Sequence, residues 1–250
     1  MISSLFQSIF YNPLYNGLVF LIDILPAHNV AWAVILLTVI VMTILFPLSK
    51  ASVRTQIKMK MLEGEMNKIK EQYKDQQKQA EAMMAFYKKN NLNPFATLFM
   101  AILQIPIILA MYYIFYKGGL PVVDTTLLYS FVAVPTMVNM GFFGLTISQP
   151  AIILGFFAAI SQFFQAQYSV PPFVPSKNLD GKKSFKDDFA KSMNMQIKYV
   201  IPFFIFIFSF KVSGAVALYW TTKSLFMIGQ ELVIRHTVRK PLESAALKVN

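Results

Sequence analysis

A charged segment at residues 49–93, between two long apolar runs, is the feature that most constrains this chain. It holds ten of the 23 lysine and arginine residues, contains no proline, and has Gly64 as its only glycine. Ala, Gln, Glu, Lys and Met dominate it, a composition typical of a solvent-exposed helix. Its apolar residues recur at spacings of three and four, which predicts two amphipathic helices. We therefore expect a helical hairpin on the water side of a membrane.

The overall composition is that of a membrane protein. The 250 residues are 56% hydrophobic and only 14% charged, whereas a soluble domain carries about a quarter charged residues. The net charge of +11 would suit a nucleic-acid partner. However, the basic residues lie between apolar runs, where the positive-inside rule explains them more economically. No nucleic-acid-binding motif accompanies them.

The hydrophobic pattern predicts an all-α membrane protein with five transmembrane helices. We expect these spans at residues 30–48, 94–116, 150–168, 196–211 and 214–234. The first contains about 19 residues, or about 28 Å of helix, enough for the hydrocarbon core. Residues 1–29 are interrupted by polar side chains and are expected to form an outer interfacial amphipathic segment. The hairpin, the loop at 169–195 and the basic tail at 235–250 then share the cytoplasmic side, with the N-terminus outside and the C-terminus in the cytoplasm.

Residues 117–149 need a separate argument, because the stretch at 127–147 is apolar enough to be mistaken for a span. If it crossed the membrane, the later basic loop and tail would lie opposite the hairpin. If it stays outside, all three basic segments lie on one side, as the positive-inside rule requires. Pro135, Asn139 and Gly141 also interrupt any helix there. We therefore predict an extracytoplasmic connector that lies against the membrane surface.

The sequence offers no chemistry of the usual enzymatic kinds. It contains no cysteine, which excludes disulfides, thiol catalysis and thiolate metal sites. His28 and His236 lie far apart without a neighbouring ligand, so we expect neither a metal nor a cofactor. No nucleophile–base pair, phosphate-binding loop or pair of catalytic carboxylates is present. The pattern disfavours an enzyme or a proton-coupled carrier.

Lys223 is the sharpest candidate among polar residues inside the spans. It follows Gly214 by about nine residues, which places it near mid-membrane by helical rise. An ammonium at that depth costs at least about 2.5–3.5 kcal/mol to insert. One interpretation is a positive charge that faces a water-filled cavity; the other is a lysine that extends to the inner headgroups. Tyr219 lies one turn earlier on the same helix face.

Two further groups of residues are candidates for function. Polar side chains that could line the same cavity, as a partly hydrated groove, are Thr38, Gln104, Ser161, Gln162 and Gln165. Singly, such residues more often serve as interhelical hydrogen-bond partners. The hairpin carries a set of methionines: Met59, Met61, Met66, Met83 and Met84. They suit an adaptable apolar face that recruits varied substrates, and packing of one hairpin helix on the other explains them equally well.

The order of these parts resembles the YidC/Oxa/Alb family of membrane protein insertases, over about residues 11–236. The motifs that carry the resemblance are Leu37-Thr38-Val39-Ile40 with Phe46-Pro47-Leu48, Lys58 to Leu62, Ile69 to Lys74, Met83 to Lys88, Asn93-Pro94, Leu103-Gln104-Ile105-Pro106-Ile107, and Leu218-Tyr219-Trp220 ahead of Gln230. Each is weak alone, but their order and spacing are specific. The resemblance implies a hydrophilic groove open to the cytoplasm and to lipid but closed outside. It also implies a cytoplasmic hairpin that receives substrates.

One departure from the family pattern concerns the charge of that groove. The family commonly carries an arginine in the first span, five residues before the proline, and Met42 stands at that position here. Our hypothesis is that Lys223 supplies the missing charge. The chain also looks like a minimal form, without the large extracytoplasmic domain of some members.

The resemblance implies a membrane protein insertase and chaperone of the bacterial cytoplasmic membrane. Its partners would be nascent membrane proteins and anionic lipids, with the ribosome and the Sec translocon as further candidates and no small-molecule substrate. A small-solute channel or carrier subunit is the alternative. A purely structural scaffold is a third possibility.

Overall fold

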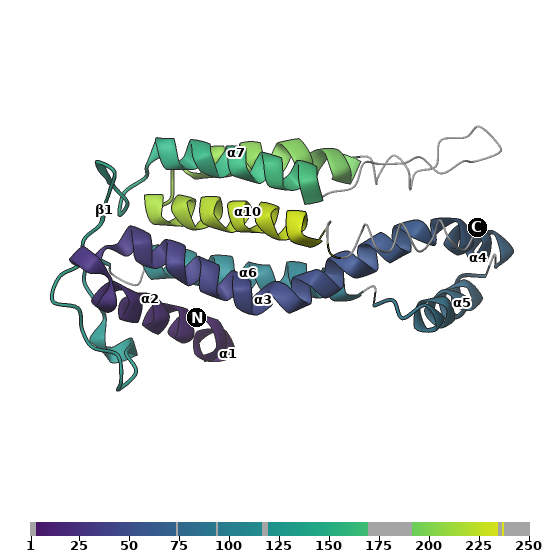
Figure 1. Ribbon diagram of the computed structural model, residues 1–250, viewed down its shortest axis with the longest axis horizontal. Helices are drawn as coiled ribbons and strands as arrows, with labels where there is room; N and C mark the ends of the chain where they lie inside the picture. The colour runs from purple at the N-terminus through teal and green to yellow at the C-terminus, as the bar shows by residue number, and fades with distance from the viewer. Residues whose placement is uncertain are drawn as a thin grey trace. The chain divides into compact units, whose positions relative to one another are not determined.

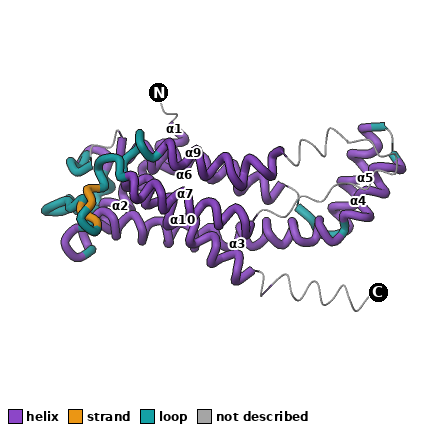
Figure 2. The backbone as a smooth tube through the Cα atoms, turned by 90° about the horizontal axis from the view of Figure 1, so that it is seen from above, coloured by secondary structure: helices purple, strands orange, loops and turns teal. Residues whose placement is uncertain are grey.

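A computed structural model describes residues 4–73, 75–93, 95–116, 120–169, 192–234 and 237. Helices make up most of the described chain, and the strands are two short segments (Figure 2). The chain divides into two compact units, formed by Met1–Met42 with Pro106–Glu231 and by Thr43–Ile105 with Leu232–Asn250. Most of the predicted loop at 169–195 and nearly all of the predicted tail at 235–250 lie outside the described residues.

Figure 1 shows the helices along the described chain. In chain order they are α1 (Ser4–Phe6), η1 (Gln7–Tyr11), α2 (Asn12–Ile24), η2 (Pro26–His28), α3 (Val30–Met61), α4 (Glu63–Gln72), α5 (Gln76–Lys89), α6 (Phe95–Tyr116), η3 (Thr125–Leu127), α7 (Ile152–Ser169), η4 (Gln196–Val200), α9 (Ile201–Phe208) and α10 (Gly214–Ile234). Local caps explain several starts, because a side-chain oxygen there accepts a free backbone N–H. Asn29 Oδ1 accepts the Trp32 N–H at 3.1 Å, and Asn93 Oδ1 accepts the Phe95 N–H at 3.1 Å. The Asp75 carboxylate caps α5 in the same way.

The α3 helix is longer than the first span expected from the sequence. It continues through Pro47 as far as Met61, so the helical pair that follows is formed by α4 and α5 rather than beginning at residue 49. Among the described residues, Val30–Met59 is the one helix both long and apolar enough to cross a membrane by length and composition. Ile102–Tyr116 and Ser192–Phe208 are shorter apolar helices. The five-span topology therefore stays a prediction.

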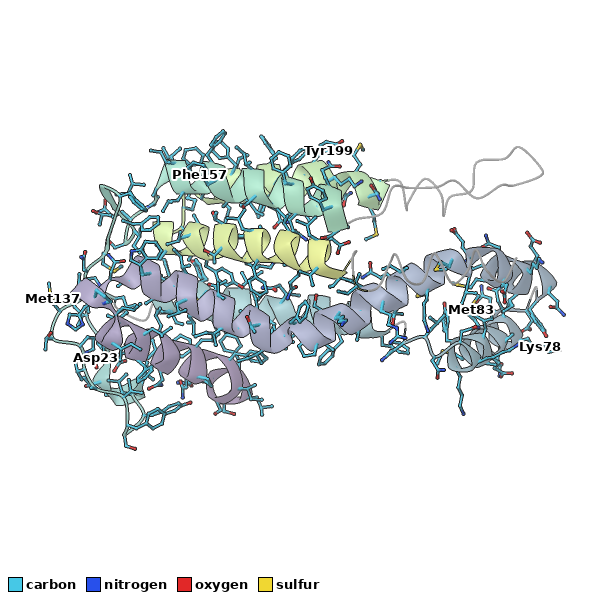
Figure 3. All side chains as sticks on the ribbon, in the orientation of Figure 1. Asp23, Lys78, Met83, Met137, Phe157 and Tyr199 are labelled. Atoms are coloured by element: carbon cyan, nitrogen blue, oxygen red, sulfur yellow. The ribbon has the colours of Figure 1, made fainter. Side chains whose placement is uncertain are left out.

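In the first unit, α7 packs closely against α9. At Gly155 an added Cβ would lie 1.9 Å from Ser209 Oγ and 2.4 Å from Ser209 Cβ, so this close approach requires glycine. The α7 and α9 helices also carry many exposed apolar side chains, among them Ile153, Phe156, Phe157, Phe203 and Phe204. Figure 3 shows Phe157 and Tyr199 pointing away from α10. An exposed surface made of many large apolar side chains marks contact with lipid or with another protein.

The connector between α6 and α7 is irregular. Its regular parts are η3 and an antiparallel pair of short strands, β1 (Gly141–Phe142) and β2 (Leu145–Thr146), with Gly141 opposite Thr146. The apolar stretch at 127–147 therefore forms no long helix. Asn16, buried on α2, holds this connector: its Nδ2 donates to the Leu127 carbonyl at 2.8 Å, and its Oδ1 accepts the Tyr129 N–H at 2.6 Å.

A tyrosine on α2 makes a second contact with the connector. The Asp124 backbone N–H donates to the Tyr15 hydroxyl at 2.7 Å. Burial raises the pKa of Tyr15 above its usual value, so the phenol stays protonated through the physiological range. Asn16 and Tyr15 thus form hydrogen bonds with backbone groups of the connector, which has few backbone–backbone hydrogen bonds between strands.

The close approach at Gly155 yields a stability prediction. Gly155→Ala forces α7 and α9 apart and should destabilise the protein by about 1–3 kcal/mol, the usual cost of overpacking. The matched control is Gly229→Ala, also inside a helix, where an added Cβ meets nothing within 4 Å. It should be neutral or stabilising by about 0.5–1 kcal/mol. Thermal unfolding in detergent measures both, and adding Ser209→Gly to Gly155→Ala should restore part of the loss. Equal stability of the two alanine variants would contradict the packing described.

Candidate functional site

A row of hydrogen-bonded polar side chains joins α10 to α7. Ser224 Oγ donates to Gln162 Oε1 at 3.2 Å, and Gln162 Nε2 donates to Gln165 Oε1 at 2.7 Å. Gln165 Nε2 in turn donates to Ser169 Oγ at 3.3 Å. Ser224, Gln162 and Gln165 are buried. We call these four residues the polar seam; its hydrogen bonds offset the cost of burying amides between apolar helices.

Lys223 lies next to the seam on α10, and its side chain is only 8% exposed. No hydrogen-bond or ion-pair partner for it is found within the described part of the chain. A lysine lying along a lipid-facing surface would be open in a structure without lipid, as Phe157 is at 53%. The burial of Lys223 therefore favours the interpretation in which it faces the bundle interior. Tyr219, one turn earlier, is buried on the same face.

The face of α10 that carries Lys223 is directed at α3. Gln230 follows Lys223 by seven residues, about two turns, and so shares its face. Gln230 Nε2 donates to the Met42 carbonyl at 3.4 Å, and the Met42 side chain is itself buried. Met42, where the resemblance implies an arginine, therefore lies against the helix that carries the buried lysine. By helical rise, Lys223 is about 10 Å along α10 from this contact.

The remaining predicted groove residues lie in different settings. Thr38 is buried one turn before Met42, and its hydroxyl donates to the Val34 carbonyl of its own helix at 2.6 Å. Ser161 likewise donates within α7, to the Ala158 carbonyl at 3.0 Å. Gln104 is half-buried on the part of α6 that belongs to the second unit. The structure thus brings Met42, Gln162 and Lys223 onto three contacting helices, and it leaves the relation of Gln104 to them open.

Two residues of this region were not singled out as site candidates from the sequence. Ser224 connects α10 to α7, and Gln230 connects it to α3. In the sequence, Gln230 belongs to a family motif but not to the expected groove residues. A usable signal did exist, because polar residues that interrupt an apolar helix and lie on one side of it usually face other helices.

In the second unit, the hairpin methionines divide into two groups. Met66, only 8% exposed, forms a core cluster with Phe86 and Leu92, and Met59 and Met83 pack against that cluster. Figure 3 shows Met83 between α4 and α5. Met61 and Met84 instead remain exposed, Met84 at 52%. Packing therefore accounts for Met59, Met66 and Met83, and only the other two remain available to a partner.

A pocket lies beside Met84 at the C-terminal end of α5. Its volume is about 460 Å³, and it is lined by Met84, Ala85, Tyr87, Lys88, Leu92, Asn93 and Phe95. Its walls are mainly apolar, with Lys88 as the one charged lining residue. The exposed methionine thus contributes to a concave surface rather than projecting alone.

Comparison with known proteins identifies the family. The sequence profile described as 60Kd inner membrane protein matches residues 21–241. The chain belongs to this family. The resemblance inferred from the sequence motifs is thereby confirmed, and the chain is a mostly helical member of a membrane-protein family.

Several relatives of this chain carry the name membrane protein insertase YidC. The protein from Clostridium tetani is 29% identical over 217 residues, which cover 86% of this chain and 86% of the relative. The protein from Ectopseudomonas mendocina is 27% identical over 223 residues, 89% of this chain but 33% of the relative. The protein from Polynucleobacter asymbioticus is 30% identical over 223 residues, 85% of this chain and 34% of the relative. The chain therefore spans about a third of the length of several relatives and most of the length of another.

The polar seam yields a prediction about coupling between α7 and α10. In a double-mutant cycle of Ser224→Ala with Gln162→Met, the two changes should be non-additive by about 0.6–1.7 kcal/mol, the range for hydrogen bonds between membrane helices. Thr221→Ala with Gln162→Met is the matched control, because the Thr221 hydroxyl donates to Ala217 of its own helix. That pair should be additive. Unfolding in detergent measures both cycles, and an additive Ser224–Gln162 pair would remove the seam's role in joining the helices.

Proposed function

We propose that this protein is a membrane protein insertase and chaperone. It moves polar segments of substrate proteins through a hydrophilic groove open to the cytoplasm and releases apolar helices sideways into lipid. Family membership and the name shared by its relatives support the class of function. The observation that carries the mechanism is the burial of Lys223, without a partner among the described residues, on the face of α10 that contacts α3.

The proposed topology has five spans, with the N-terminus outside and the C-terminus in the cytoplasm of a bacterium. The spans are the first part of α3, then α6, α7, η4 with α9, and α10. The distribution of basic residues in the sequence supports this orientation, since it would place the basic α4–α5 hairpin and the later basic sequence segments on one side of the bilayer, as the positive-inside rule requires. The connector between α6 and α7 then lies outside.

The proposed action is physical rather than enzymatic, and it needs no nucleotide or other cofactor. A wet groove part-way through the bilayer shortens the hydrocarbon that a polar segment must cross. An aspartate at mid-membrane costs about 2.5–3.5 kcal/mol on insertion scales. A cation 4 Å away at an effective dielectric of 20 contributes about 4 kcal/mol, so one lysine can offset one acidic residue. Burial of the apolar part of the substrate in lipid then completes transfer.

In this mechanism Lys223 replaces the arginine whose position Met42 occupies. The two residues are on contacting helices, so a positive charge on α10 can act on the same part of the groove as a positive charge on α3. Gln162 and its seam partners supply donors and acceptors for the polar backbone of a segment in transit. Tyr219 and Thr38 complete the proposed lining.

The hairpin of α4 and α5 is proposed to receive substrates before they enter the groove. Met61 and Met84 are exposed, and thioether side chains adapt to varied apolar partners. The substrates are nascent membrane proteins; anionic lipids, the ribosome and the Sec translocon are further proposed partners, which the basic side of the protein suits.

The first functional prediction concerns Lys223. Lys223→Ala should slow insertion of a substrate with an acidic N-terminal tail by at least about tenfold, because a loss of about 1.4 kcal/mol, a part of the charge stabilisation, already corresponds to a factor of ten. Lys223→Arg should keep most of the activity, since it retains the charge. The assay is insertion into vesicles containing the purified protein, scored by protease protection of the tail.

Two controls make this test specific. A substrate whose tail lacks acidic residues should insert equally well with either protein, and Lys211→Ala, which removes an exposed lysine, should have no effect. Unchanged insertion of the acidic tail by Lys223→Ala would remove the proposed role of the lysine. Solute flux through the vesicles without insertion would instead support a channel or carrier.

The second functional prediction separates recruitment from packing in the hairpin. Met61→Gln with Met84→Gln should weaken binding of an apolar substrate helix severalfold and leave unfolding unchanged, because both side chains are exposed. Met66→Gln should destabilise the hairpin by about 1–3 kcal/mol, since it buries an amide without a partner. Titration with a fluorescent substrate and thermal unfolding measure the two effects. Normal binding by the double variant would refute recruitment through these methionines.

A further inference from the structure

The turn between β1 and β2 places a phenylalanine where the backbone disfavours one. Phe143 and Gly144 are the two residues between the paired Phe142 and Leu145, and their φ angles are 45° and 78°. Two-residue hairpin turns with both φ angles positive normally carry Asn, Asp or Gly. A bulky side chain in this left-handed region is an outlier, because Cβ crowds the carbonyl oxygen.

The same phenylalanine is also open to its surroundings. Phe143 is 83% exposed, the largest value among exposed large hydrophobic side chains of the described residues. The turn therefore carries two unfavourable features at one residue, a strained backbone and an exposed aromatic ring. An asparagine would relieve both. Strain that persists at such a site indicates a role for the side chain itself.

The β1–β2 turn contacts the start of α3, so it lies at the same depth relative to a membrane as the first turn of that helix. The rings of Trp32 and Phe142 meet edge to face at 6.0 Å, and those of Phe142 and Phe143 at 4.8 Å. Asn29 Nδ2 donates to the Gly141 carbonyl at 2.8 Å. Trp32 is half exposed near the first turn of the long apolar helix α3. Tryptophan at the end of such a helix is typical of the membrane–water interface.

The composition around the turn suits hydrocarbon rather than water. From Thr125 to Ser169 the sequence has no charged residue. Other connector side chains are also apolar and exposed, namely Phe131, Val134 and Met137. Beyond the turn, α7 begins with the exposed Ile152 and Ile153. Exposed apolar side chains therefore continue from the connector onto this helix. An uncharged surface of this kind offers little to a water-soluble partner.

We propose that the β1–β2 hairpin is a lipid anchor, with the Phe143 ring inserted among the acyl chains of the leaflet in which α3 begins. Transfer of the ring into hydrocarbon offsets the strain of its backbone. The anchor fixes the depth of the connector and, through the Trp32 contact, the depth of α3. This inference depends on embedding in a bilayer and not on insertion activity, so it can fail or succeed separately from the proposed function.

The absence of cysteine makes a direct test simple. Phe143→Cys is labelled with a nitroxide in the full chain, in vesicles of phosphatidylethanolamine and phosphatidylglycerol. Thr125→Cys is the matched control, on the same connector, exposed, and next to the charged Asp124. The label at position 143 should be severalfold more accessible to oxygen, and severalfold less accessible to a water-soluble nickel chelate, than the label at position 125.

The other outcomes overturn the anchor. Equal nickel accessibility at both positions would place the turn in water. Low accessibility to both reagents, or spin–spin broadening between labels, would indicate a protein partner or a second copy of the chain. If the cysteine variant does not fold, photocrosslinking with p-benzoylphenylalanine at position 143 answers the same question. Adducts with the mass of a lipid are expected, and adducts with a protein alone would refute the proposal.

Discussion

The position of α10 is set by a few polar contacts to neighbouring segments, and the arrangement of the first unit depends on them. At its start, the Gly214 N–H donates to the Gln149 carbonyl at 2.8 Å and the Ala215 N–H to the Ile147 carbonyl at 3.0 Å, which fixes its height against the connector. Further along, Ser224 contacts α7 and Gln230 contacts α3, which fixes its rotation. Apolar packing tolerates rotation and sliding far more readily than paired hydrogen bonds do. The burial of Lys223 follows from this fixed rotation.

Keeping a lysine at this position opposes stability. A buried ammonium without a carboxylate partner is among the more costly arrangements in a helical bundle. A methionine or leucine would pack as well on the face shared with Tyr219, at no such cost. Features of this kind mark functional sites, where local rules are broken for a purpose. The seam beside Lys223 has no such conflict, because each of its buried amides has a partner.

The sequence predicted the helices with strong end signals well and the side-chain partners poorly. The spans expected to begin at residues 214 and 94 correspond to α10 and α6, which begin at Gly214 and Phe95. The span expected at residues 30–48 is shorter than the helix that contains it, because α3 absorbs Pro47 and continues to Met61. Spacing also cannot tell which methionine of the hairpin faces its neighbour, so the burial of Met66 and the exposure of Met84 required coordinates. Spacing alone also does not separate Ser224, which bonds to α7, from Thr222, whose hydroxyl donates to the Leu218 carbonyl of its own helix.

The distribution of polarity along α7 and α10 bears on whether a groove or a two-sided pore is the better proposal. The first half of α7, Ile152–Ile160, has no polar side chain, whereas the second half contains the seam and ends at Ser169, where the basic loop begins. The α10 helix repeats this order, with Gly214–Trp220 largely apolar and Thr221–Glu231 rich in polar groups. Both helices therefore become polar toward the same end, the one assigned to the cytoplasm. A channel needs polar lining along its whole length, whereas a notch that shortens the hydrocarbon barrier from one side needs it only in the half that water enters.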